Sequence, residues 1–432
     1  MAVSAIPTKY VRVVKSATCG RKLVATSRFA PGQCIHEELP YAYSLLDKKR
    51  KLYCDFCLKQ LCSTPLRCAS CKYVYYCNLS CQQSDWTRCR HKHICKQLKR
   101  ILPRPHFVLL LSEIIRKPRQ PLPCTHDDED RFPTNPDQLV SHHEKLIKKL
   151  NEDEKLQSTL SCLNDWFVCK TEAEGSRLLK MLGATDCNSY TICDNYLIGI
   201  AVGIYLRASM VNHSCDPNCA LVFDGRKLQI RTIKDIEEGE ECTISYVDFS
   251  APTKERQAKL EEEYHFTCKC VKCIEEINAL EPDAGLTEEI LGLEKSKEEI
   301  EMQIQFALIT KDWTKVLQKF ETYLRSSLPA HHYLLVEVRD LAFGICCTIE
   351  SWGKAAQMGQ LITKPYRDHY GPYHPSLGIH LLRMGQALLN LKRFQEARKY
   401  LTEAKSVLEV THGPQHSLMK STSVQKLLCR FR

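Results

Sequence analysis

At 432 residues the chain exceeds the length that one compact core usually supports, which predicts two to four structural units. Hydrophobic residues make up 44% and charged residues 26% of the sequence, so a disordered or fibrous protein is excluded. The net charge of +10 is concentrated between Asp47 and Arg104, where 14 Lys and Arg accompany 3 Asp. This basic segment favours contact with nucleic acid or an acidic protein, or it is a solvated face that keeps a small module soluble.

The apolar runs indicate the expected compartment. No run of signal-peptide length opens the sequence, and the longest later run, FVLLLSEII, is too short to span a bilayer. We therefore expect a soluble intracellular protein without membrane contact. In that reducing environment the 25 cysteines are expected to be metal ligands or buried side chains rather than disulfides.

Residues 10–46 alternate apolar and polar side chains, with turn signals at Cys19–Gly20 and Pro31–Gly32. This pattern predicts short β-strands. Between Cys54 and Cys95 the cysteine density rises and the regular periodicity fades, which predicts a small metal-organised insert within the strand-forming core.

Eight residues of this insert have the spacing of two zinc sites. They are Cys54, Cys57, Cys68, Cys71, Cys77, Cys81, His91 and Cys95. The first four form two Cys-x-x-Cys pairs, in which both thiolates can face one tetrahedral ion. The last four form two pairs at i, i+4, which places both side chains on one helix face. Sites closed by four protein ligands predict structural zinc. Cys89 and His93 are nearby competitors, and His93 stays open as an alternative to His91.

The middle of the chain changes character twice. Residues 103–136 contain seven prolines and the acidic run 127–130, which predicts a partly irregular segment. Residues 138–183 carry leucines among charges and are expected to be helical. Strand-like segments return at 188–248, around a turn at Glu238–Gly239, and are interpreted as the second half of the interrupted core.

A second cysteine cluster follows. Cys268, Cys270 and Cys273 lie too close together to complete a tetrahedral site, so a distant fourth ligand is required. Cys215 and Cys219 are both candidates. The alternative is a redox-active Cys-x-x-Cys pair, but the third neighbouring cysteine favours zinc.

Beyond about residue 280 the pattern is helical and contains a repeat. Trp352-Gly-Lys-Ala-Ala corresponds to Phe394-Gln-Glu-Ala-Arg, and Gly371-Pro-Tyr-His corresponds to Gly413-Pro-Gln-His. Both matches have an offset of 42 residues. This period is typical of stacked helical hairpins that resemble tetratricopeptide repeats. The alternative is an irregular helical bundle.

The segment from Asn212 to Asn218, NHSCDPN, is dense in turn-forming residues and could be a tight loop between strands. Together with Gly239-Glu-Glu and the following Ile244-Ser-Tyr, however, it resembles the two signature motifs of SET-domain methyltransferases. The first cysteine insert, with aromatic residues before Cys77 and His91, resembles a MYND finger. The later cysteine triplet resembles the post-SET zinc site. This arrangement resembles the SET and MYND domain-containing lysine methyltransferases over nearly the full chain.

The resemblance implies an α+β protein, with a mostly-β SET core interrupted by a MYND zinc finger and a helical insert. A post-SET zinc site and an all-α, TPR-like C-terminal domain follow. The implied parts are 1–48 (SET, N-terminal part), 49–100 (MYND finger), 101–185 (linker and helical insert), 186–250 (SET core), 251–278 (post-SET) and 279–432 (TPR-like domain).

The resemblance also implies three structural zinc ions. MYND fingers interleave their ligands, which assigns Cys54, Cys57, Cys77 and Cys81 to one ion and Cys68, Cys71, His91 and Cys95 to another. In the post-SET site Cys215 would join Cys268, Cys270 and Cys273.

The implied cofactor is S-adenosylmethionine, and the implied reaction is methyl transfer to a protein lysine. The cofactor-binding residues implied are Cys19, Gly20, Arg21, His142, Asn188, Asn212, His213, Tyr246 and Phe266. Tyr246 is implied as the catalytic residue that orients the amine, while Tyr190 and Tyr264 line the lysine channel. The free lysine amine has a pKa of about 10.4, so an apolar aromatic channel must favour its neutral form.

The implied partners are protein substrates, histone or otherwise, together with proline-rich peptides that bind the finger. A weak nucleic-acid contact through the basic finger segment is a further reading. We expect a monomer in the cytoplasm and nucleus. The competing hypothesis is a non-catalytic adaptor or transcriptional co-regulator, motivated by Lys22, which stands where relatives commonly carry a second glycine.

Overall fold

The structure, a computed structural model, describes residues 10–16, 20–87, 90–102, 105–117, 132–149, 154–167, 171–248, 250–278 and 332–421, and a few residues at 299–320 and 424–427. The chain forms two compact units. The first contains Met1–His213, Pro217–Ile244 and Glu261–Phe266, and the second contains Ser214–Asp216, Ser245–Leu260 and Thr267–Arg432.

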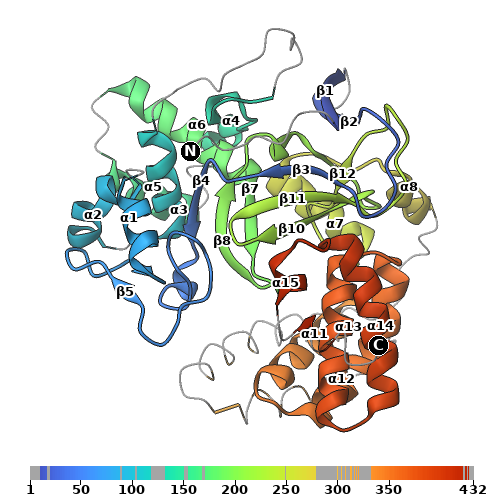
Figure 1. Cartoon of the computed structure of the whole chain (residues 1–432). Coiled ribbons are helices and arrows are strands. Elements are labelled where there is room, and N and C mark those ends of the chain that lie inside the picture. The colour runs from blue at the N-terminus through green and yellow to red at the C-terminus, as the bar shows by residue number, and fades with distance from the viewer. Residues whose placement is uncertain are drawn as a thin grey trace. The chain divides into compact units, whose positions relative to one another are not determined.

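Short strands form the core of the first unit (Figure 1). They are β1 (Val11–Ser16), β2 (Gly20–Ala25), β3 (Cys34–Glu38), β4 (Ala42–Leu45), β5 (Leu66–Arg67), β6 (Tyr75–Tyr76), β7 (Ser189–Cys193), β8 (Gly199–Ile204), β9 (Asn212–His213), β10 (Cys219–Asp224), β11 (Lys227–Thr232) and β12 (Thr243–Ile244). Two three-stranded antiparallel sheets have the orders β10-β11-β3 and β4-β8-β7. Each therefore joins a strand that precedes residue 46 to strands that follow residue 188, which confirms the prediction of an interrupted core.

The strands differ in how their side chains are buried: β1 has a period of two, and β11 is buried on both faces. In β1 the side chains of Val11 and Val13 are buried, whereas that of Arg12 between them is exposed. Leu228 and Ile230 of β11 are fully buried, and their strand lies between β10 and β3 in the middle of its sheet. The alternation expected over residues 10–46 is thus seen in β1, whereas β4 is buried at all four of its positions.

The first unit also contains helices. They are η1 (Asp47–Lys49), α1 (Leu79–Thr87), α2 (Arg90–Arg100), α3 (His106–Arg116), η2 (Pro136–Gln138), α4 (His143–Lys149), α5 (Glu154–Trp166), α6 (Glu172–Asn188), η3 (Ala208–Met210) and most of the π-helix η4 (Leu260–Tyr264). Helix α3, most of whose apolar residues are buried, packs against β4. The helix predicted over 138–183 is thus several shorter helices. One of these helices, α6, begins after Thr171, because the side chains of Thr171 and Glu174 form a capping box there.

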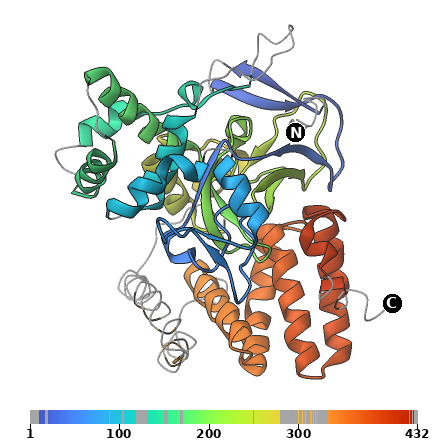
Figure 2. The ribbon, with the colours of Figure 1, turned by 60° about the vertical axis from the view of Figure 1, so that its left-hand side comes forward.

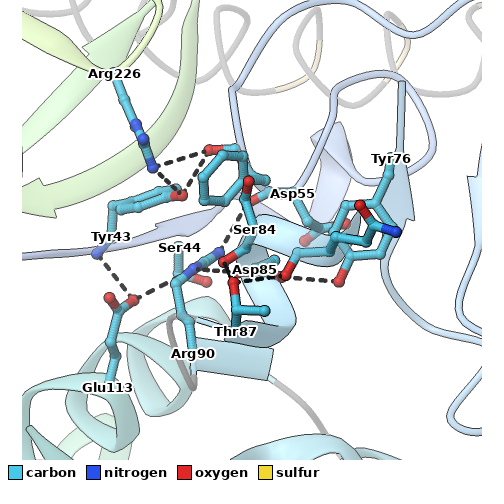
Figure 3. Close-up of polar contacts among 12 residues, drawn as sticks. Tyr43, Ser44, Asp55, Tyr76, Ser84, Asp85, Thr87, Arg90, Glu113 and Arg226 are labelled. Carbon is cyan, nitrogen blue, oxygen red and sulfur yellow. Dashed lines mark hydrogen bonds and ion pairs between the residues drawn. The ribbon is translucent and has the colours of Figure 1, made fainter. Parts of the chain in front are cut away.

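A buried charge network joins the cysteine-rich insert to strand β4 (Figure 3). The Arg90 guanidinium pairs with Asp85 at 3.1 Å and with Glu113 at 3.8 Å. It also lies over the Tyr43 ring, 4.1 Å from its centroid, and Arg226 donates to the Tyr43 hydroxyl at 3.1 Å. Because a buried guanidinium is stable only when it is paired, these contacts hold the insert in one position on the core.

The second unit contains α7 (Thr253–Lys259), α8 (Val271–Asn278), α11 (Tyr333–Thr348), α12 (Trp352–Tyr370), α13 (Pro375–Asn390), α14 (Phe394–Thr411) and α15 (Ser417–Lys420). Helices α11 to α14 pack side by side in chain order (Figure 2). No helix of the described residues is long and apolar enough to cross a membrane.

The helix bounds follow the 42-residue repeat. Helix α13 begins and ends 42 residues after α11, and α14 begins 42 residues after α12. Gly371 and Gly413 both have a positive φ, 68° and 77°, which favours glycine. The side chains of His374 and His416 both accept a hydrogen bond from the backbone two residues ahead and so begin α13 and α15. The repeat predicted from the sequence is therefore confirmed.

Candidate active site and zinc centres

The structure brings the expected metal ligands together in three groups of four. They are Cys54, Cys57, Cys77 and Cys81; Cys68, Cys71, His91 and Cys95; and Cys215, Cys268, Cys270 and Cys273. Within each group the ligand atoms all lie within 4.8 Å of one another. Sulfur atoms about 2.3 Å from a tetrahedral zinc are about 3.8 Å apart. Sulfur separations of 3.4 to 3.8 Å occur in these groups, so all three fit zinc.

His91, rather than His93, faces the second group. Its Nε2 lies 3.3 Å from Cys68 Sγ and 3.7 Å from Cys71 Sγ. His93 is exposed, and its carbonyl accepts a hydrogen bond from Arg116. Burial lowers the pKa of His91 to about 4, which keeps the imidazole neutral as a metal ligand requires. The competitor Cys89 lies outside the described residues.

The third group resolves the choice between Cys215 and Cys219. Cys215 Sγ lies 3.5 Å from Cys273 Sγ, whereas Cys219 begins β10 in the first unit. Arg256 of α7, which sequence reasoning missed, is fully buried and donates to Cys215 Sγ at 3.3 Å. Its local sequence, TKERQAK, carries no signal of burial because charged residues surround it.

The Asn212 side chain connects the two signature motifs with the N-terminal turn. Strand β9, which contains Asn212 and His213, pairs in parallel with β12. Asn212 Nδ2 donates to the Arg21 carbonyl at 3.2 Å and to Glu241 Oε1 at 2.9 Å. Lys22 lies 3.9 Å from the same Glu241 carboxylate. The polar groups of three distant segments therefore meet at Asn212.

Asn218, at the end of the NHSCDPN segment, forms a second connection that sequence reasoning missed. Its amide donates to the Glu241 carbonyl at 2.9 Å, and its oxygen accepts from the Thr243 amide at 2.8 Å. The side chain is buried, with 8% of its surface exposed. The residue type could have indicated this role, because an asparagine side chain in a turn can form hydrogen bonds with backbone groups. This clamp holds the first motif against the strand of the second.

The segment around residues 138–142 lies between Arg21 and Asn188. Arg21 Nη2 donates to the Gln138 carbonyl at 2.7 Å, and Asn188 Nδ2 donates to the Val140 carbonyl at 2.8 Å. His142 has a positive φ of 41°, and its ring lies 5.1 Å from that of His265. Burial and the neighbouring His265 lower the pKa of His142. Gly20 has a φ of 72° at the start of β2. Cys19 lies outside the described residues.

Aromatic side chains lie beside this region. The rings of His213 and Phe266 are 5.9 Å apart. The Tyr190 hydroxyl donates to the Ala208 carbonyl at 2.8 Å. Burial, followed by the charge of Glu263, raises the pKa of Tyr264 to about 12, so this phenol is neutral at physiological pH.

Tyr246 belongs to the second unit, where it follows β12 by two residues and is partly buried. In the same segment the Ser245 hydroxyl donates to the Val247 carbonyl at 2.6 Å, which gives the backbone beside Tyr246 a defined turn. Asn212, His213, Tyr190 and Tyr264 belong to the first unit.

Comparison with known proteins adds an independent observation. A family model described as "SET domain" matches residues 20–247. The chain is 30% identical to "Histone-lysine N-methyltransferase SMYD3" of Homo sapiens, covering 95% of this chain and 96% of that protein. It is 27% identical to "N-lysine methyltransferase SMYD2-A" of Xenopus laevis (92% and 94%) and 27% identical to "N-lysine methyltransferase SMYD2" of Homo sapiens (92% and 93%). These matches agree with the resemblance seen in the motifs.

Proposed function

Because the chain belongs to the SET-domain family and to its SET and MYND domain-containing group, we propose that it is an S-adenosylmethionine-dependent protein-lysine N-methyltransferase. The observation that carries the proposal is the meeting of Arg21, Glu241 and the β12 backbone at the Asn212 motif, within the region that the SET model matches. These segments are far apart in the sequence, so their meeting requires the folded core.

We propose that the cofactor binds in the first unit, beside the contacts that Asn212 makes with Arg21 and Glu241. Its residues are Gly20, Arg21, His142, Asn188, Asn212, His213 and Phe266, with Cys19 and Tyr246 assigned by resemblance alone. S-adenosylmethionine supplies a methyl group on a sulfonium. The positive φ of Gly20 supports a close approach of backbone to ligand, and the His213 and Phe266 rings offer faces for a flat or cationic group.

Methyl transfer requires a neutral lysine amine, although a free lysine has a pKa of about 10.4. An aromatic channel of Tyr190 and Tyr264 would disfavour the charged amine by desolvation, and the burial that raises the pKa of Tyr264 supports this role. The Tyr246 hydroxyl would then accept a hydrogen bond from the amine and align its lone pair with the methyl group, which is catalysis by positioning.

Zinc has no part in this chemistry. Each metal group offers four protein ligands, so a bound zinc would have no open position for substrate or water. The three ions would hold the finger and the post-SET segment in their folded shapes.

Labelling with tritiated S-adenosylmethionine tests the function. Full-length, zinc-loaded protein is incubated with core histones and with a cell lysate, and label transferred to protein lysine is measured. Tyr246→Phe removes the positioning hydroxyl and should lower kcat roughly 100-fold, because the amine is no longer aligned with the methyl group. Tyr196→Phe, on an exposed turn, is the matched control and should have wild-type activity. Labelling that Tyr246→Phe leaves undiminished would exclude the assigned mechanism.

A non-catalytic adaptor is the second candidate, favoured by the ion pair between Lys22 and Glu241 beside the proposed cofactor site. It predicts capture of protein partners without cofactor binding in calorimetry. For either function, we propose protein substrates and proline-rich partners of the finger, a monomeric state, and a location in cytoplasm and nucleus. Contact of the basic finger with nucleic acid would require an affinity that falls steeply with salt.

A further inference from the structure

Arg256 is a buried cation in the second unit. It lies on α7 (Thr253–Lys259), and only 2% of its surface is exposed, although Lys254 and Lys259 of the same helix are exposed. A buried guanidinium is costly unless charged and polar partners surround it. The partners of Arg256 therefore show what this side chain stabilises.

The guanidinium of Arg256 donates to five groups. Nε donates to Cys215 Sγ at 3.3 Å, and Nη2 lies 3.6 Å from Cys273 Sγ. Nη2 also donates to Glu276 Oε2 at 2.6 Å and to Thr253 Oγ1 at 3.1 Å, while Nη1 donates to the Ala251 carbonyl at 2.5 Å. Two ligands of the third metal group thus share one planar donor.

This geometry suits a zinc site made only of thiolates. Four thiolates outweigh the charge of one divalent cation, so the occupied site carries a net negative charge. A guanidinium beside it offsets part of that charge, and its N–H groups draw electron density from the sulfur atoms they touch. Thiolates with less electron density are poorer nucleophiles toward electrophilic reagents.

We propose that Arg256 is a positioning residue of the third zinc site, which retains the metal and protects Cys215 and Cys273 from electrophiles. Through Ala251, Thr253 and Glu276 its remaining N–H groups join α7 and α8 to the same site. Cys215 is the middle residue of the NHSCDPN segment, so the zinc held in this way also fixes the middle of the signature motif.

Zinc release from the full-length, zinc-loaded protein tests the proposal. The metallochromic chelator 4-(2-pyridylazo)resorcinol follows the release of each zinc equivalent. Arg256→Met removes the charge and the donors, and should release one of the three equivalents about 10–100-fold faster. Arg256→Lys keeps the charge but loses the planar fork, and should lie between Arg256→Met and wild type. Lys259→Met, exposed on the same helix, is the matched control and should release all zinc at the wild-type rate.

The two finger zincs in the first unit are internal controls, because a general loss of folding would release all three equivalents faster. Mass spectrometry after brief treatment with N-ethylmaleimide should show faster labelling of Cys215 and Cys273 in the variants, with labelling of Cys57 and Cys77 unchanged. Wild-type release of the third zinc in both variants, or equal acceleration of all three, would overturn the proposal. If Arg256→Met does not fold, Arg256→Lys decides by the same readouts.

Discussion

His380 shows how a single buried side chain links stability to pH. Its Nε2 lies 2.8 Å from Thr363 Oγ1, its ring packs 5.1 Å from that of Phe343, and 3% of its surface is exposed. Burial, followed by the charges of Arg367 and Arg383, lowers its pKa from 6.5 to about 3. The folded state therefore holds this imidazole neutral, whereas the unfolded chain protonates it near pH 6.5.

Because the folded pKa lies below the unfolded one, the stability that His380 contributes is complete above pH 6.5 and is lost as the pH falls toward 3. We expect this group to lower the free energy of unfolding by about 1.4 kcal/mol for each pH unit below the unfolded pKa. Urea unfolding between pH 4 and 8 measures the slope. His380→Gln removes this titrating group and should reduce the slope, while buried histidines such as His374, whose pKa burial lowers to about 4, keep part of it. An equal slope in both proteins would assign the acid sensitivity to other groups.

Helix α6 shows how an element can position the proposed cofactor site without contributing its chemistry. An added Cβ at Gly183 would lie 2.2 Å from the Ser141 carbonyl oxygen and 3.2 Å from His143 Cα. The backbone on either side of His142 therefore lies in direct contact with α6. Asn188, further along α6, holds the same segment through the Val140 carbonyl. Because Gly183 has no side chain, the segment can lie close enough to α6 for Asn188 to reach the Val140 carbonyl.

Gly183→Ala should push this segment away from α6, lower the free energy of unfolding by about 1–3 kcal/mol and weaken S-adenosylmethionine binding. Gly175→Ala is the matched control, because no atom lies within 4 Å of an added Cβ at that position of the same helix. It should raise stability by about 0.5–1 kcal/mol and leave the cofactor Kd unchanged. Thermal melts and calorimetry measure both quantities. Equal cofactor affinity in the two variants would contradict the positioning role.

At the scale of the whole molecule, the zinc ligands tie together segments that have no long hydrophobic core of their own. The finger contains two strands of two residues each and two helices, and its Cys54 group and Cys68 group interleave along the chain. The third group joins Cys215 to Cys268, Cys270 and Cys273. Metal binding in such sites is coupled to folding.

Chelation of all three zincs should therefore abolish methyl transfer together with the native structure. Circular dichroism and methyltransferase activity are measured after treatment with a strong chelator, and again after zinc is restored. We expect both signals to fall in parallel, because no zinc site has an open coordination position. A protein that loses activity but keeps its fold and cofactor affinity would indicate a catalytic metal.

Much of the local structure follows from the sequence. The i, i+4 spacing of His91 and Cys95 depends only on helix geometry, and both lie on α2. The 42-residue offset between Gly371 and Gly413 reappears as the offset between helices, because each repeat carries its own turn and apolar face. Strand-like segments before residue 46 and after residue 188 also indicated the two halves of the strand core. The roles assigned to Tyr246, Tyr190 and the cofactor residues remain predictions.

Only the tertiary structure decided which distant groups meet. Arg256 is buried among charged neighbours, Gly183 lies under Ser141, and the Asn212 side chain contacts Glu241. The physical reason is that helix and strand periods are set by covalent geometry over a few residues, and so are legible along the chain. Contacts between residues that are tens or hundreds of positions apart in the chain depend on how whole helices and strands pack. The identities of the two residues alone do not reveal such a contact.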